Sequence, residues 1–288
     1  MALSTTTAAE LTQEQVAAIL TQPLEQESRF LAAVPAGNII DTPGPLRVPK
    51  LPSSKADTLA WVGENEKIPE TDYDFDELRL LESSIKSIKT LTRFSNELGR
   101  QAVVSIDAAL QARLVADVAA KVDAQFLSDT GDGVTIPRGL FAQTGTQSVA
   151  VGGAFTVDHV LEGQGLALAA NVNTDSMALF VDAGTYMGMR AQKDTQGRYL
   201  VQPDVTAGGL VSPVLGAQVL ISNRVPAGKA ALVDMSKVIV ARDVAPAVKL
   251  LDQTFGDYDQ LALRVVTRMD MGLTAPEAAV IFDGIEAA

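Results

Sequence analysis

The chain has 288 residues, of which 47% are hydrophobic and 20% charged, a balance typical of a globular protein and not of a disordered one. Its net charge is -12 and its Lys and Arg residues are scattered, which argues against tight duplex binding driven by counterion release. It has no cysteine and one histidine, which excludes disulfides and argues against zinc or haem ligation. We therefore expect no metal site and no cofactor.

The N-terminal region carries no recognisable targeting signal. Residues 1–15 lack a basic start followed by an apolar core, and no apolar stretch reaches the roughly 20 residues of a membrane-spanning helix. From residue 10 to residue 34 the spacing of apolar positions predicts two helices, interrupted at Pro23. These helices form either a packed hairpin or an arm that docks on a neighbouring subunit, and the sequence favours neither.

Residues 35–54 contain five prolines and two glycines. Such a segment cannot be a helix or a central strand, because proline lacks the backbone donor that both require. We expect an extended arm that runs over other structure.

Residues 55–92 are predicted to form a long two-stranded hairpin. Acidic and aromatic residues alternate from Asp72 to Asp76, which predicts a strand with one charged and one aromatic face. Residues 78–94 predict a returning strand or a pair of strands. The single tryptophan, Trp61, lies in the first half of this hairpin. Because an isolated two-stranded hairpin is marginally stable in water, we expect it to pack on a partner.

The strongest helical pattern comes next. Ser95 is a suitable N-cap, apolar residues recur mostly every four positions, and Gly131 and Gly133 end the pattern. About 30 residues at about 1.5 Å each give a helix on the order of 45 Å long. A helix of this length usually serves as a spine.

Helices and strands alternate after residue 150. The predicted helices are 155–170 and 182–192, and the predicted strands are 177–181, 218–222, 230–234, 237–241 and 258–271. From about residue 150 this pattern predicts α/β structure.

Motifs that would indicate catalysis are incomplete. Asp158 and His159 are adjacent, but no Gly-x-Ser-x-Gly turn supplies a nucleophile for a triad. The carboxylates that begin at Asp72 resemble the start of a calcium loop, but the sixth position is not glycine and the twelfth is not glutamate. Glu64 and Glu66 could act as acid and base, but an exposed hairpin offers no pocket to shift their pKa values. We expect no catalytic residue.

Short segments in a fixed order carry a resemblance to one family. They are residues 60–64 (AWVGE), 95–98 (SNEL), 131–133 (GDG), 136–140 (IPRGL), 194–200 (DTQGRYL), 215–219 (LGAQV), 222–228 (SNRVPAG) and 233–234 (VD). From about Leu46 to its end, the chain resembles the major capsid proteins of tailed bacteriophages, which have the Hong Kong 97-type fold. The resemblance implies an α+β fold class for this chain.

The resemblance implies a division of the chain. Residues 1–54 would be the N-terminal arm, 55–92 the extended β-hairpin loop, 93–150 the peripheral domain with the spine helix and its β-sheet, 151–255 the α/β axial domain, and 256–288 the return strand of the peripheral domain. Members of this family assemble as hexamers and pentamers into an icosahedral shell that encloses double-stranded DNA.

The resemblance also implies partners and a location. We expect scaffolding, portal and decoration proteins as partners, packaged DNA that is enclosed without specific binding, and no membrane. The chain would be part of the virion, assembled in the cytoplasm of the host bacterium. We expect the hairpin to form an inter-subunit contact through Trp61, Glu64, Glu66, Lys67, Asp72 and Asp74.

Two features depart from the family pattern. Some members join subunits by an isopeptide bond between a lysine in the hairpin and an asparagine of the peripheral domain near the end of the chain. Lys67 could supply the lysine, but the last asparagine is Asn223, so we expect no crosslink. Only about 50 residues precede the hairpin, which predicts a separate scaffolding protein or a chain that begins after processing.

Two other functions compete with the capsid interpretation. An encapsulin, a bacterial compartment of the same fold that encloses an enzyme, is the alternative. A soluble acidic α/β enzyme has little support, because no catalytic constellation is present.

Overall fold

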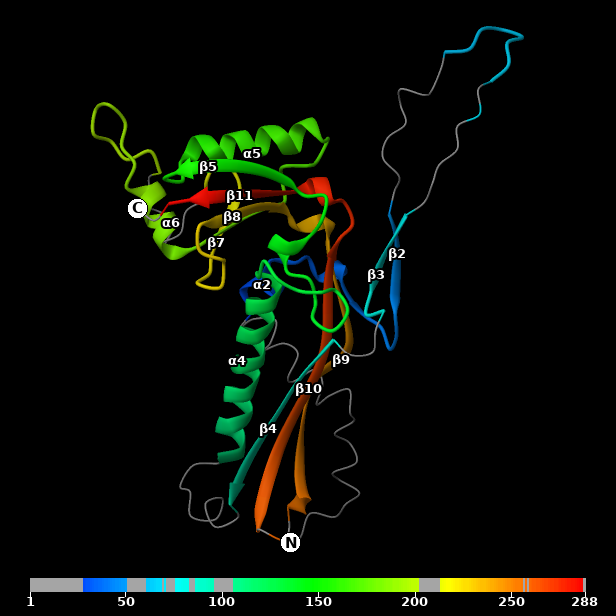
Figure 1. The fold of residues 1–288 in the computed structure, drawn as a ribbon, viewed down its shortest axis with the longest axis vertical. Helices are drawn as coiled ribbons and strands as arrows, with labels where there is room; N and C mark the ends of the chain where they lie inside the picture. The colour runs from blue at the N-terminus through cyan, green and yellow to red at the C-terminus, as the bar shows by residue number, and fades with distance from the viewer. Residues whose placement is uncertain are drawn as a thin grey trace.

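The structure is a computed structural model that describes residues 28–50, 61–68, 70, 76–82, 86–95, 106–201, 213–255, 257 and 259–286. It contains a five-stranded sheet, a four-stranded sheet and a two-stranded ribbon. Figure 1 shows the five-stranded sheet at the top, the longer four-stranded sheet below it, and the ribbon leading into a hairpin that projects from their junction. Both larger sheets are mixed, with parallel and antiparallel strand pairs, and the helices pack on them in separate layers, which confirms the predicted α+β class.

The upper sheet has the strand order β5-β11-β8-β6-β7. Its strands are β5 (Gln147–Gly153), β11 (Ala279–Ile285), β8 (Lys229–Asp234), β6 (Met177–Val181) and β7 (Gln218–Ile221). Helices α5 (Val157–Ala169) and α6 (Ala183–Arg190) contribute to the hydrophobic cluster on one of its faces. Every residue of β6 is buried, because Leu179 points into this cluster while Phe180 points to the opposite face.

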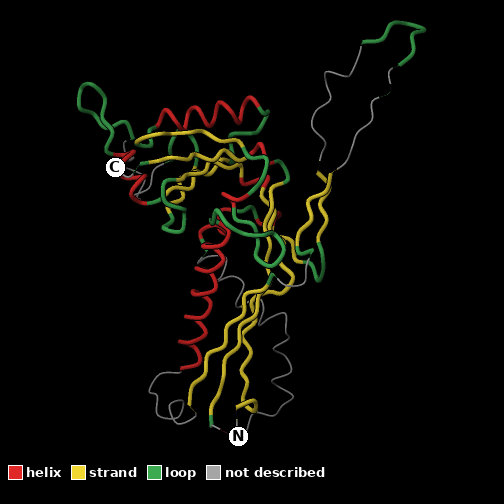
Figure 2. The backbone as a smooth tube through the Cα atoms, in the orientation of Figure 1, coloured by secondary structure: helices red, strands yellow, loops and turns green. Residues whose placement is uncertain are grey.

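The lower sheet has the strand order β1-β9-β10-β4. Its strands are β1 (Ile39–Asp41), β9 (Val238–Phe255), β10 (Gln260–Leu273) and β4 (Ser87–Ser95). Helix α4 (Ile106–Phe126) lies along one side of this sheet, and the ribbon of β2 (Leu46–Lys50) and β3 (Asp76–Leu80) lies toward the other (Figure 2). Val122 of α4 shares a core with Leu263 and Val265 of β10.

One hydrophobic core joins the two sheets. The side chain of Phe30, in the short helix α2 (Arg29–Ala33), lies 5.4 Å from Phe126 of α4 and 5.7 Å from Phe180 of β6, measured between ring centroids. Such aromatic contacts add to the stabilisation from burial alone. Four 3-10 turns complete the described elements: η1 (Ala36–Asn38), η3 (Leu140–Ala142), η4 (Met235–Lys237) and η6 (Pro276–Ala278).

Most predicted elements after residue 150 are confirmed, and one prediction before it is wrong. The strand 177–181 and the helices predicted for 155–170 and 182–192 are present, while the strand predicted for 237–241 continues to Phe255. Ser95 does not cap the long helix: it is the last residue of β4, because it still pairs with Gln260 of β10, and the described helix runs only from Ile106 to Phe126.

The two sheets do not follow the domain boundaries that the resemblance implies. Strand β9, expected in the axial domain, belongs to the lower sheet, and strand β11, expected in the peripheral return, belongs to the upper sheet. The helix predicted between residues 10 and 24 lies outside the described residues.

Candidate functional site: the projecting hairpin and its base

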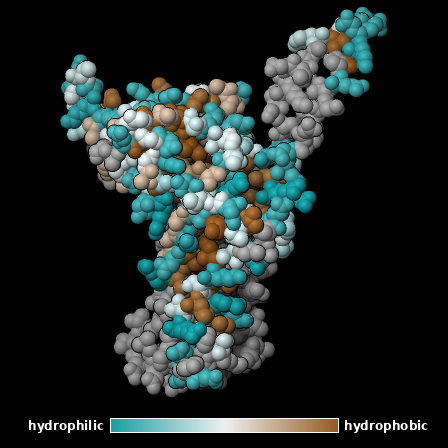
Figure 3. All heavy atoms as spheres, in the orientation of Figure 1, coloured by the Kyte–Doolittle hydropathy of each residue, from teal (hydrophilic) through white to brown (hydrophobic). Residues whose placement is uncertain are grey.

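The tip of the hairpin is the most exposed part of the described chain. Trp61 is fully exposed, and Ile68 is three-quarters exposed. Figure 3 shows hydrophobic side chains among hydrophilic ones at the far end of the projection. A local turn orders the tip: the Gly63 N–H donates to Oε2 of Glu66 at 3.2 Å, and the Glu66 N–H donates to the Gly63 carbonyl at 3.3 Å.

The structure places the predicted contact residues as follows. Trp61, Glu64, Glu66 and Lys67 all lie exposed in this tip, and Figure 1 shows it far from both sheets. Asp72 and Asp74 lie outside the described residues. The tip therefore brings four of the six predicted residues together, without support from the sheets of its own chain.

The ribbon below the tip is polar on its surface and apolar underneath. Lys50 and Asp76, opposite each other in β2 and β3, form an ion pair at 3.4 Å. The backbone N–H of Glu77, with Lys50, lowers the pKa of Asp76. Exposed pairs of this kind contribute little stability. The ribbon is held instead by Leu80, which packs with Ala241 of β9.

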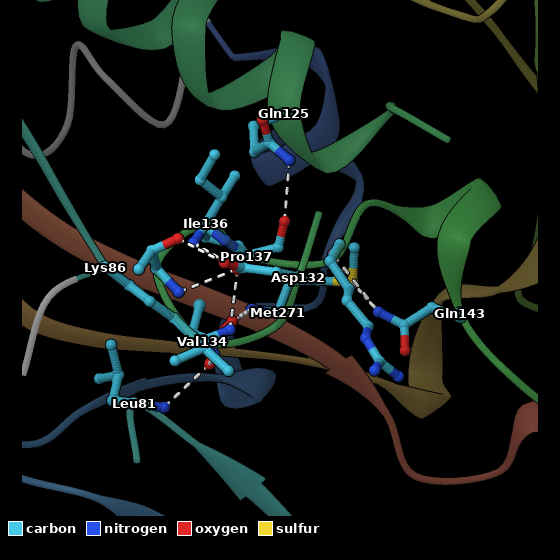
Figure 4. Close-up of polar contacts among 12 residues, drawn as sticks. Leu81, Lys86, Gln125, Asp132, Val134, Ile136, Pro137, Gln143 and Met271 are labelled. Carbon is cyan, nitrogen blue, oxygen red and sulfur yellow. Dashed lines mark hydrogen bonds and ion pairs between the residues drawn. The ribbon is translucent and has the colours of Figure 1, made fainter. Parts of the chain in front are cut away.

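A buried ion pair fixes the end of the ribbon to the lower sheet. Nζ of Lys86 donates to Oδ2 of Asp270 in β10, and the side chains are only 4% and 2% exposed. The same oxygen accepts the Leu81 N–H at 2.9 Å, and Oδ1 of Asp270 accepts the Met271 N–H at 3.0 Å. Lys86, Leu81 and Met271 are labelled in Figure 4. This network joins Leu81 and Lys86 to the C-terminal end of β10.

The loop after α4 closes beside this network (Figure 4). Oδ1 of Asp132 accepts the backbone N–H groups of Val134, Thr135 and Ile136 at 2.9, 2.9 and 2.8 Å. The Thr135 hydroxyl, which donates to Oδ2 at 2.5 Å, and these N–H groups hold the pKa of Asp132 far below its usual range. Gln125 of α4 donates to the Pro137 carbonyl at 2.8 Å. The loop thus presents Val134 and Ile136 to solvent.

Sequence reasoning missed both of these features. Lys86 and Asp270 are 184 positions apart, so no local pattern pairs them. The Asp132 turn carries a weak local signal, since an aspartate side chain in a turn often accepts the N–H groups of the residues that follow it.

The histidine has a structural role. Nδ1 of His159 accepts the Thr156 N–H at 3.1 Å and lies 2.8 Å from the Thr156 hydroxyl, an arrangement that caps the start of α5. Among the described residues, no group of three or more His, Asp or Glu side chains is placed to hold a metal ion. No helix in the described part of the chain is long and apolar enough to cross a membrane.

Comparisons with solved structures identify the fold. The capsid of a native GTA particle has a TM-score of 0.72 and 18% identity, covering 92% of this chain and 91% of that one. A chain from Mycobacterium phage Cain has a TM-score of 0.69 and 17% identity, covering 90% of each chain. At this level of identity the likeness establishes the fold alone, and it confirms the predicted Hong Kong 97-type capsid fold.

Comparisons of sequence identify the family. The major capsid protein of Halomonas phage phiHAP-1 is 27% identical over 220 residues, which are 76% of this chain and 35% of that protein. The chain therefore spans about a third of the length of this curated relative. These matches are to phage or GTA capsids and favour the capsid interpretation over the encapsulin alternative. The model of the family described as "Phage capsid family" matches residues 9–284, nearly the whole sequence, and the chain belongs to that family.

Proposed function

We propose that this chain is the major capsid protein of a tailed phage. Copies of it assemble as hexamers and pentamers into an icosahedral shell that encloses double-stranded DNA. The observation that carries the proposal is the hairpin tip, which projects from the body with Trp61 fully exposed. An aromatic side chain buries about 150–250 Å² when it is enclosed, so leaving it in water forgoes a large stabilisation. A neighbouring copy would supply that enclosure.

The proposed role is structural and not catalytic. Scaffolding, portal and decoration proteins would be its partners during assembly, which would take place in the cytoplasm of the host bacterium. The net charge of -12 supports enclosure of DNA without specific binding, because an acidic chain gains little from releasing the counterions of DNA.

The inter-subunit contact is assigned to Trp61, Glu64, Glu66, Lys67, Asp72 and Asp74. Deleting residues 56–76 should abolish shells, as seen by negative-stain electron microscopy and sedimentation, while leaving a folded and soluble protein. A finer test replaces one side chain. Trp61→Ala should reduce the yield of shells sharply, whereas Tyr199→Ala, at a half-exposed aromatic residue outside the hairpin, should not. Intact shells from the deletion, or equal effects of the two substitutions, would refute the assignment.

We also propose that the mature shell has no isopeptide crosslinks. Residues 224–288 contain no asparagine that could accept a lysine. Denaturing gels of mature particles should show only the monomer band. A ladder of covalent oligomers would show the proposal to be wrong.

A further inference from the structure

A cavity of about 280 Å³ lies where the C-terminal end of helix α4 faces the first residues of strand β4. The loop after α4 closes one side of it. Lys86, Gln125, Ile136 and Pro137, which Figure 4 labels, all contribute to its wall. Its volume is close to the lower limit of the range of about 300–1,000 Å³ that is usual for pockets that hold small molecules, so its size suits a small ligand.

The floor of the cavity is apolar. Val122 and Phe126 of α4 and Met269 of β10 belong to the core that joins the two sheets, and Ile88 of β4 packs against the same core. Side chains that line a cavity forgo the dispersion contacts that close packing would give them. An apolar group bound against this floor would restore those contacts.

The loop after α4 is held in a position that leaves the cavity open. Gln125 donates to the Pro137 carbonyl at 2.8 Å, and Asp132 accepts the Ile136 N–H at 2.8 Å. These two bonds fix the backbone of Ile136 and Pro137, the residues through which the loop closes the cavity. Ile136 remains 49% exposed as a result. The cavity is therefore built into the fold by hydrogen bonds outside it.

The rim of the cavity is cationic. Lys86, Lys89 and Lys121 line it, and within the described part of the chain no aspartate or glutamate does. Lys86 is bound to Asp270. Lys89 and Lys121 are exposed, and neither forms an ion pair with a residue that the structure describes. In a chain of net charge -12, an apolar cavity whose charged lining residues are all lysines is suited to an anion.

We propose that this cavity binds a small organic anion with an apolar body, the class to which medium-chain carboxylates belong. The apolar body would lie against Val122, Phe126 and Met269, and the anionic head would lie between Lys89 and Lys121. Such a ligand would contact both α4 and the lower sheet. It would stabilise their packing, because a ligand that binds only the folded chain shifts the equilibrium toward it. The inference goes beyond the proposed function, since binding does not require assembly into shells.

Decanoate is the probe for this site. It is added to the full-length chain at concentrations below those at which it forms micelles. Isothermal titration calorimetry should show saturable binding of one decanoate per chain, and thermal unfolding should shift to higher temperature. Decanol has a similar apolar body without the charge, and it should bind at least about tenfold more weakly because it cannot pair with the lysines. No saturable binding, or equal affinities for decanoate and decanol, would overturn the proposal.

Charge reversals locate the site. Lys121→Glu should weaken decanoate binding at least about tenfold. Lys237→Glu, at an exposed lysine outside the cavity, changes the net charge equally and should leave the affinity nearly unchanged. Trp61→Ala should bind like wild type, since the exposed hairpin tip is not the proposed site. Circular dichroism checks that each variant folds.

Equal losses in Lys121→Glu and Lys237→Glu would mean that the anion is attracted by the charge of the whole chain, and loss in Trp61→Ala would place it at the hairpin tip. Either result would overturn the proposal. Shells from a chain that does not bind decanoate would reject this site alone. A chain that binds decanoate but forms no particles even with its scaffolding protein would reject the proposed function alone.

Discussion

Lys86 and Asp270 form an ion pair that is almost completely buried, although the two residues are 184 positions apart in the sequence. Asp270 also accepts two backbone N–H groups, one of them from Leu81 at the end of the ribbon. The carboxylate is therefore compensated by a cation and by two donors, as a buried charge requires. The pair determines where the hairpin leaves the lower sheet.

Removing the carboxylate should be costly. Asp270→Ala leaves a buried ammonium and two backbone N–H groups without this acceptor, and we expect it to lower the free energy of unfolding by about 3–5 kcal/mol. The control is Asp76→Ala, which breaks the exposed pair with Lys50 and should cost less than about 1 kcal/mol. Urea denaturation of the unassembled chain measures both. Similar losses for the two variants would mean that the Lys86–Asp270 pair does not hold the hairpin base.

The sequence predicts those parts of the fold whose pattern is local. Residues 177–181 are a run of apolar residues before Asp182, and the structure has a strand there followed by a helix capped by that aspartate. Strands β5 and β11 were not predicted, because Gln147–Gly153 is rich in small residues and β11 follows a 3-10 turn with no strong alternation. Both become strands through pairing with each other, between segments more than 120 residues apart.

The residues of the candidate site also differ in whether the sequence indicates them. Trp61 can be singled out from the sequence because it is the only tryptophan, and its acidic neighbours because they lie in the same predicted hairpin. The buried pair at the base of the hairpin does not stand out, because Lys86 precedes β4, Asp270 lies in β10, and the two residues meet only through the long-range pairing of these strands. Register depends on long-range pairing that no local pattern specifies.

Asp123 of α4 anchors the start of the short helix α2. Its Oδ1 accepts the Ser28 hydroxyl at 2.5 Å and the Phe30 N–H at 3.2 Å, and its Oδ2 accepts the Arg29 N–H at 3.0 Å. Asp123→Ala should cost on the order of 3 kcal/mol, since it leaves buried donors unsatisfied. It should also speed proteolytic cleavage near α2. Asp117→Ala, at an exposed aspartate of the same helix, is the control and should change neither quantity. Unchanged cleavage in Asp123→Ala would show that the anchor is dispensable.

Two glycines of α5 should respond to alanine in opposite ways. A Cβ at Gly163 would lie 2.5 Å from the ring of Phe282, which is fully buried, whereas a Cβ at Gly165 meets nothing within 4 Å. We expect Gly163→Ala to destabilise the chain by about 1–3 kcal/mol through overpacking. Gly165→Ala should stabilise it by about 0.5–1 kcal/mol, because alanine favours the helix. Thermal unfolding of the two variants beside wild type gives the sign of each change, and a common sign would contradict the packing of α5 on β11.

Asp132 should titrate far below an ordinary aspartate. The Thr135 hydroxyl and three backbone N–H groups stabilise its ionised form, so its pKa is lower in the folded than in the unfolded chain. A carboxyl group whose pKa is lowered by folding stabilises the folded chain at pH values above its unfolded pKa. This stabilisation is lost as the pH falls toward its folded pKa. The stability difference between wild type and Asp132→Ala should therefore stay constant from pH 7 to about pH 4 and shrink only below it. Thr135→Val removes the largest cause and should raise the pKa of Asp132, as followed by NMR of labelled aspartate carboxyl carbons. A difference that already declines above pH 5, or an unchanged pKa in Thr135→Val, would contradict this account of the loop.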